Sequence, residues 1–155
     1  MNIVDQQKGL YGMLRNFVRG FDDALSKELC QSLIEWFESE PDVRTKEVNR
    51  ETRNDKQMWL SETSKLYEPV QKVKLDMLQE YSEEFPYAYR GARKLLTPEI
   101  KIQRTNPMGG GFHNFHAEIS HWENCTRALV WTIYLNDIPN GEGETEFLYD
   151  KIRIQ

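Results

Sequence analysis

The residues best suited to chemistry gather in one short stretch of this sequence. Its three histidines are His113, His116 and His121, and Glu118 follows His116 by two positions. On a β-strand, positions i and i+2 project from the same face, so an imidazole nitrogen and a carboxylate oxygen would point to one place. Such a donor pair suits Fe(II), Mn(II) or Zn(II). The same pair also occurs on exposed strand edges that bind nothing, so the spacing alone leaves both interpretations open.

The other two histidines fit this donor pair less well. His113 lies at an odd offset from His116, so we expect it on the opposite face of the strand, in packing or in support of the site. His121 falls beyond the strand in a polar loop and is expected to be solvated. The His-Glu-x-x-His motif of zinc peptidases is missing. We therefore take His116 and Glu118 as the candidate metal ligands.

The front of the chain is predicted to be helical. Apolar side chains recur every four residues over about 23–39, with Asp22 or Asp23 where an N-cap would stand, and at helical spacing over about 63–84. Between them, residues 42–57 are rich in charges of both signs and poor in apolar side chains. We expect this segment to be a solvated connection.

Beyond residue 97 the apolar period changes from that of a helix to that of a strand. Gly, Pro and Asn clusters separate short segments of alternating or continuous apolar character. The expected strands are 100–102, 112–118, 127–135, 145–149 and 152–154. Helices followed by short strands favour an α+β fold, with the helices packed on one face of a sandwich or barrel.

Composition excludes several classes of protein. The chain has 155 residues, enough for a single domain, and a net charge of −5, which gives no general attraction to nucleic acid or anionic lipid. Its basic cluster within 90–104 lacks interleaved aromatics and is expected to be a solvated face. No apolar run could span a membrane, and two cysteines provide neither a disulfide framework nor a thiolate metal site. We expect a soluble cytoplasmic or otherwise intracellular protein.

Three blocks follow one another in the second half of the chain. They are residues 111–118, ending in His-Ala-Glu, residues 127–137, containing Tyr-Leu-Asn-Asp, and residues 141–147, Gly-Glu-Gly-Glu-Thr-Glu-Phe. In order and spacing they resemble the Fe(II)/2-oxoglutarate-dependent dioxygenases of the prolyl 4-hydroxylase type. The resemblance covers about residues 98–155. It implies a double-stranded β-helix, or jelly roll, on which the N-terminal helices pack.

The resemblance also implies roles for individual residues. His116 and Glu118 match the first two iron ligands, with Glu in place of the more usual Asp. Tyr134 matches a tyrosine whose hydroxyl can bind the distal carboxylate of 2-oxoglutarate. Asn106 stands in the place of another tyrosine that helps to hold the cosubstrate, so that contact is either made by Asn106 or Thr105 or lost. No catalytic residue beyond the metal ligands is implied.

The implied activity is oxidative. Fe(II), 2-oxoglutarate and dioxygen would together hydroxylate a prolyl or similar side chain of a peptide or protein substrate. Arg127 is expected to pair with an acidic neighbour, whereas Thr145 and Phe147 share a face and are expected in the barrel interior. Nothing in the sequence selects the substrate or the oligomeric state.

The resemblance is incomplete at its C-terminal end. The family completes its triad with a later histidine, followed by an Arg or Lys that anchors 2-oxoglutarate, and neither is present here. We therefore expect residues 1–155 to be one incomplete domain, with about 1–95 as helical support and about 96–155 as the first part of the β-helix. As given, it should be inactive or very weak. The alternatives are a non-catalytic binding or assembly module derived from that family, and an unrelated metal-binding or jelly-roll protein, including one whose site is completed by another subunit.

Overall fold

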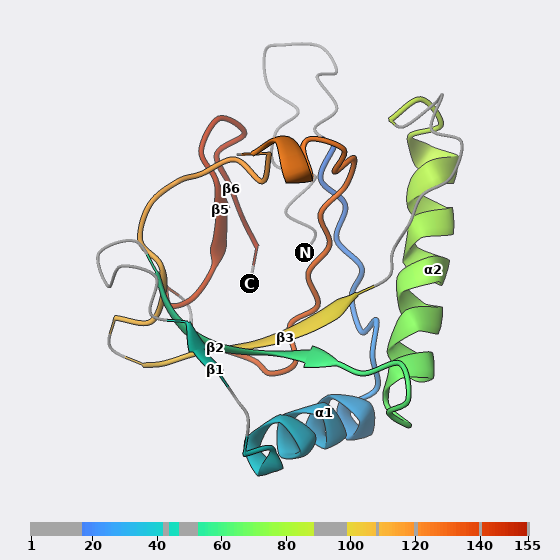
Figure 1. The fold of residues 1–155 in the computed structure, drawn as a ribbon. Helices are drawn as coiled ribbons and strands as arrows, with labels where there is room; N and C mark the ends of the chain where they lie inside the picture. The colour runs from blue at the N-terminus through green and yellow to red at the C-terminus, as the bar shows by residue number, and fades with distance from the viewer. Residues whose placement is uncertain are drawn as a thin grey trace.

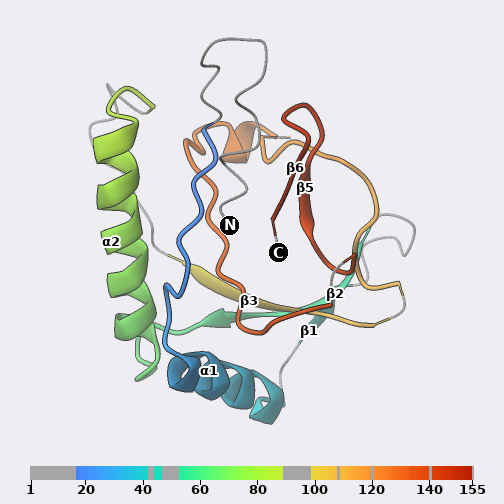
Figure 2. The ribbon, with the colours of Figure 1, turned by 180° about the vertical axis from the view of Figure 1, so that it is seen from behind.

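The computed structural model places most of the chain. It describes residues 17–41, 44–46, 53–88, 99–107, 109–119, 121–139 and 141–154. Over these residues the fold is α+β, as predicted, with two α-helices and small antiparallel sheets. Helix α1 (Lys27–Ser39) lies beneath the main sheet and α2 (Tyr67–Glu84) stands beside it (Figure 1). The view from behind shows the same arrangement (Figure 2).

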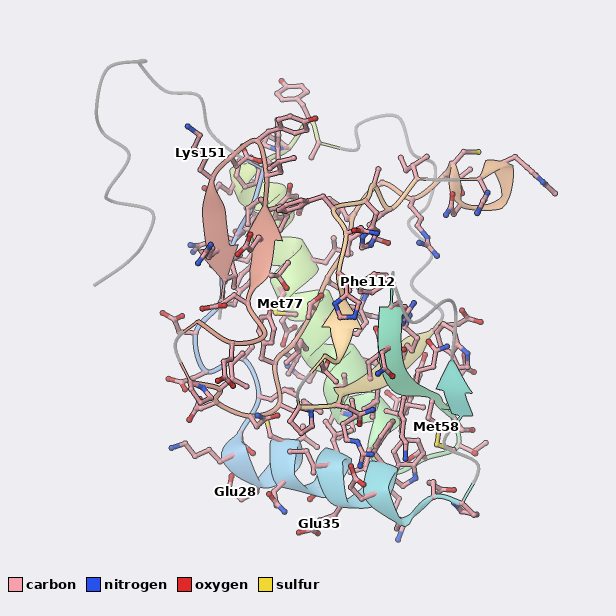
Figure 3. All side chains as sticks on the ribbon, turned by 90° about the vertical axis from the view of Figure 1, so that its left-hand side faces the viewer. Glu28, Glu35, Met58, Met77, Phe112 and Lys151 are labelled. Atoms are coloured by element: carbon pink, nitrogen blue, oxygen red, sulfur yellow. The ribbon has the colours of Figure 1, made fainter. Side chains whose placement is uncertain are left out.

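Helix α1 turns an apolar face to the sheet. Leu33 and Phe37 are buried there, and the polar side, with Glu28 and Glu35, points away from the sheet (Figure 3). The helix begins later than predicted, because its N-cap is Ser26, whose hydroxyl accepts a hydrogen bond from the backbone N–H of Leu29 at 3.2 Å. That bond satisfies one of the amides that lack a helical partner in the first turn. The prediction of Asp22 or Asp23 as N-cap is therefore wrong.

Helix α2 confirms the predicted second helix and adds one feature that its pattern did not indicate. Val70 is buried on the face toward the core, as its spacing predicted. Lys74 is also buried, with 3% of its surface exposed, and its ammonium lies 5.1 Å from the centre of the Trp131 ring. Burial lowers the pKa of Lys74. The indole face partly replaces the water that this cation has lost.

The main sheet is organised around a strand that was predicted to be a solvated connection. Strand β2 (Arg53–Leu60) pairs antiparallel with β1 (Arg44–Lys46), β3 (Ile100–Thr105) and β4 (Gly111–Phe112). The prediction for 42–57 is therefore wrong at 44–46 and 53–57, and its remaining residues lie outside the described ones. Because most residues of β2 are charged or polar, the spacing of apolar residues in the sequence did not indicate a strand here.

The hydrophobic core forms where the helices meet β2 and β3. Leu60 and Ile100 are register partners and both are buried, together with Ile102, Leu33 and Phe37. The alternation of Ile100 and Ile102 thus marks the inner face of β3, as predicted. No helix among the described residues is long and apolar enough to cross a membrane.

The C-terminal half contains fewer strands than expected. Of the predicted strand 112–118 only Phe112 belongs to a strand, in β4, and residues 127–135 belong to no strand. Strands require a partner for their backbone groups. The segment 127–135 is held instead by side chains, since Trp131, Ile133 and Leu135 pack against the core. A short 3₁₀ turn, η2 (Trp122–Asn124), precedes it.

The last two strands form a hairpin of their own. Strand β5 (Thr145–Phe147) pairs antiparallel with β6 (Ile152–Ile154), which confirms strands at both predicted places. The hairpin lies on the opposite side of the main sheet from α1 (Figure 1). Phe147 is half-buried but Thr145 is exposed, so the predicted interior position is wrong for Thr145.

Candidate metal site

The structure brings the two predicted metal ligands together. The Nε2 atom of His116 lies 3.5 Å from Oε1 of Glu118, and both side chains are half-exposed. The backbone that carries them forms no regular strand, and Glu118 lies at a bend, so the two side chains meet without the strand predicted over 112–118. Phe112, which marks the start of this segment, lies where β4 meets β2 (Figure 3).

The separation of the two donor atoms fits a shared cation. Nitrogen and oxygen donors about 2.1 Å from one ion lie roughly 3.0 Å apart at a right angle and roughly 3.4 Å apart at the tetrahedral angle. The observed 3.5 Å between His116 and Glu118 needs only a small side-chain adjustment to reach either value. An imidazole with a carboxylate is also the donor set that Fe(II) and Mn(II) accept.

A hydrogen bond sets the orientation of the His116 ring. Its Nδ1 lies 3.2 Å from the backbone carbonyl oxygen of Asn114. A carbonyl oxygen can only accept, so Nδ1 is the atom that donates a proton. The other nitrogen, Nε2, faces Glu118 and serves either as a proton donor to the carboxylate or as a metal ligand. Metal-binding histidines commonly use their second nitrogen in this way.

Glu118 is oriented by a second partner. Arg127 Nη1 lies 3.2 Å from Oε2 of Glu118 and donates a weaker bond of 3.4 Å to its backbone carbonyl oxygen. The predicted pairing of Arg127 with an acidic neighbour is confirmed. Its effect is to hold one carboxylate oxygen and leave Oε1 directed toward His116.

A small hollow adjoins the carboxylate. It has a volume of about 250 Å³ and is lined by residues 117–119 on one side and 127–130 on the other. The lining is apolar except for the Glu118–Arg127 pair. The hollow thus places this ion pair beside a small apolar surface.

The other two histidines, His113 and His121, form no cluster of metal ligands with this pair among the described residues. His121 is the N-cap of η2, where its backbone N–H donates to Asn124 Oδ1 at 2.9 Å. His113 is exposed. In the described part of the chain, no third His, Cys, Asp or Glu joins His116 and Glu118 to form a three-ligand cluster.

The residues predicted to hold a cosubstrate are dispersed. The Tyr134 hydroxyl is hydrogen-bonded to Thr145 Oγ1, which ties the 127–135 segment to β5. Thr105 ends β3 as the register partner of Asp55, and Asn106 follows in the turn toward Gly110. Among the described residues, none of the three is hydrogen-bonded to His116 or Glu118.

Two residues near His116 were not anticipated from the sequence. The ring of Phe112 stacks on the His116 imidazole, with centroids 4.3 Å apart and planes inclined by 28°. The guanidinium of Arg53 lies 4.4 Å from the centre of the same phenyl ring. The i, i+4 spacing of Phe112 and His116 was visible in the sequence, but Arg53 reaches the site only through the register of β2 and β4.

Comparisons with known proteins find no match to this chain, whether among protein-family models, curated proteins or solved structures.

Proposed function

We propose that this chain carries the first two iron ligands of an Fe(II)- and 2-oxoglutarate-dependent oxygenase of the prolyl 4-hydroxylase type. Its substrate would be a prolyl or similar side chain of a peptide or protein. The observation that carries the proposal is the 3.5 Å separation of His116 Nε2 and Glu118 Oε1, with Nδ1 of His116 bonded to a backbone carbonyl. The finer fold that we propose is helices packed on the first part of a double-stranded β-helix.

Each residue of the site has a distinct task in this proposal. His116 binds through Nε2 and is oriented by Asn114, whereas Glu118 binds through Oε1 and is oriented by Arg127. The carboxylate also offsets the positive charge of a divalent ion. When bound, Fe(II) supplies the activation of dioxygen that hydroxylation of an unreactive C–H bond requires.

The cosubstrate would bind between the metal and Tyr134, which belongs to the same 127–135 segment as one wall of the hollow beside Glu118 but does not itself line that hollow. In the proposed role, the Tyr134 hydroxyl binds the distal carboxylate of 2-oxoglutarate. A hydroxyl has one donor and two acceptor lone pairs. It can therefore donate to a carboxylate while accepting a hydrogen bond from Thr145.

The site needs a third donor that these residues do not offer. After Glu118 the sequence contains one histidine, His121, and that residue caps η2. The proposal therefore expects the third ligand from a further segment or from another subunit.

A second candidate function is a non-catalytic binding or assembly module. It is favoured by the segment 127–135, which is largely apolar and paired with no strand among the described residues. Such a segment could accept a strand from a partner.

The proposed oxygenase is tested by anaerobic titration with Fe(II) and 2-oxoglutarate, followed by measurement of succinate after dioxygen is admitted. We expect weak or no binding by the 155-residue chain, and tight binding and turnover by a version extended to include a later histidine and a basic residue. His116→Ala should abolish both. His113→Ala, a neighbouring exposed histidine, is the matched control and should change neither.

Two results would overturn this assignment. Equal effects of His116→Ala and His113→Ala would remove His116 from the site. If the chain extended to include a later histidine binds no Fe(II), the non-catalytic binding or assembly module becomes the better description of this protein.

A further inference from the structure

We propose that Phe112 and Arg53 are positioning residues for His116, forming a stacked column that anchors the imidazole to the buried part of the main sheet. The consequence for metal affinity rests on the proposed function, but the column itself can be tested without a metal. Its members come from β2, from β4 and from the unpaired segment that carries the site.

The base of the column is a buried ion pair. Asp55 is 2% exposed, and its Oδ2 accepts hydrogen bonds from Arg53 Nε at 2.9 Å, from Arg53 Nη2 at 2.6 Å and from Gln103 Nε2 at 2.6 Å. Arg53 and Asp55 are two positions apart on β2, so their side chains share one face. The guanidinium is therefore fixed in the plane that its two bonds to one carboxylate oxygen define.

The middle of the column is set by strand register. Arg53 and Phe112 are direct partners in the antiparallel pairing of β2 with β4, which places their side chains next to each other. The Arg53 guanidinium carbon lies 4.4 Å from the centre of the phenyl ring, a cation–π contact. Phe112 is half-exposed as a residue even though Arg53 and His116 both lie against its ring.

The top of the column is the imidazole of His116. Its ring centre is 4.3 Å from that of Phe112, and the planes are inclined by 28°. The stack fixes the plane of the imidazole, while the bond from Nδ1 to the Asn114 carbonyl oxygen fixes its rotation within that plane. Together they determine where Nε2 points, which is toward Glu118. Without the stack, an exposed histidine on an irregular segment would sample several rotamers.

Nuclear magnetic resonance of the histidine ring tests the column in the absence of metal. In the 155-residue chain, we expect the His116 ring protons to be shifted upfield by the stacked phenyl ring. Phe112→Leu should remove the upfield shift, whereas Phe112→Tyr should preserve it. Phe115→Leu is the matched control, since Phe115 is a neighbouring exposed aromatic outside the stack.

Arg53→Lys tests the lower part of the column and provides a second variant if Phe112→Leu does not fold. Lysine keeps the positive charge beside Asp55 but lacks the planar group that covers the phenyl ring. We expect a partial loss of the upfield shift, with the dispersion of other amide signals unchanged. If the His116 ring protons of both Arg53→Lys and Phe112→Leu keep their wild-type chemical shifts, the proposed column is wrong.

Binding of Mn(II), followed by paramagnetic broadening of the His116 signals, links the column to the site. Phe112→Leu should weaken binding by about tenfold, as is typical when an orienting partner of a ligand is removed, and Phe115→Leu should not. If neither the 155-residue chain nor its extended version shows broadening of a His116 signal on addition of Mn(II), the metal proposal fails, while the stack is still judged by its ring-proton shifts. If the wild type binds Mn(II) and Phe112→Leu binds it equally well, the positioning role is wrong.

Discussion

The guanidinium of Arg127 lies 3.2 Å from the Glu118 carboxylate, on the oxygen that faces away from His116. Both side chains are about half-exposed, and an exposed ion pair of this kind stabilises a fold by at most about 1 kcal/mol. The pair therefore matters chiefly for orientation. It holds one oxygen and leaves the other available to a cation shared with His116.

Arg127→Met is expected to weaken Mn(II) binding by about tenfold, because Glu118 loses the partner that fixes its rotamer. Arg127→Lys should retain most of the affinity, since it keeps a charged donor. Calorimetric titration of the three proteins at one ionic strength measures the difference. Tighter binding by Arg127→Met would show that repulsion between the guanidinium and the metal ion outweighs orientation, contrary to this prediction.

Asp55→Asn is expected to lower the free energy of unfolding by about 3 kcal/mol, because the nearly buried guanidinium of Arg53 loses its compensating charge. Urea denaturation measures the loss. The double variant Arg53→Met with Asp55→Leu should be less damaging than Asp55→Asn alone, since it leaves no unpaired charge. A double variant that loses as much as the sum of the separate substitutions would mean that the two residues do not act as a pair.

Lys74→Met is expected to change the pH dependence of stability. Burial lowers the pKa of Lys74 in the folded state below its ordinary value of 10.5, so between the two pKa values the unfolded chain binds more protons than the folded one. The stability contributed by the wild-type residue therefore rises with pH across that interval. The free energy of unfolding of Lys74→Met, measured relative to that of wild type, should therefore decrease as the pH rises toward 10.5.

Urea denaturation at a series of alkaline pH values measures this difference for Lys74→Met. Lys72→Met, an exposed position on the same helix, serves as the control and should show a constant difference from wild type. Tyr67, whose pKa is raised by burial, titrates in all three proteins and cancels from the comparison. A constant difference for Lys74→Met would contradict the prediction.

The sequence alone predicted those helices and strands in which apolar side chains repeat at a regular spacing within one segment. The four-residue spacing of Leu25, Leu29, Leu33 and Phe37 predicted α1, and the alternation of Ile100 and Ile102 marked the inner face of β3. The start of α1 was misplaced because several polar residues nearby could cap it. Which of them does so depends on the local backbone.

Strand β2 could not be predicted from local signals. Arg53 and Asp55 are charged, and charged residues indicate exposure unless they are paired. Their burial is tolerated because each compensates the other and Gln103 on β3 adds a further donor. These partners are brought together only when the sheet forms.

For the candidate site, the spacing of His116 and Glu118 predicted from the sequence alone that their donor atoms can meet, and they do, although the strand on which that prediction rested does not form. Only the tertiary structure decided how they are held. Arg53 lies far from His116 in the chain, and the register of β2 with β4 places it beneath Phe112. A local pattern specifies which side chains share a face, whereas contacts between distant segments depend on packing and register, which the fold as a whole determines.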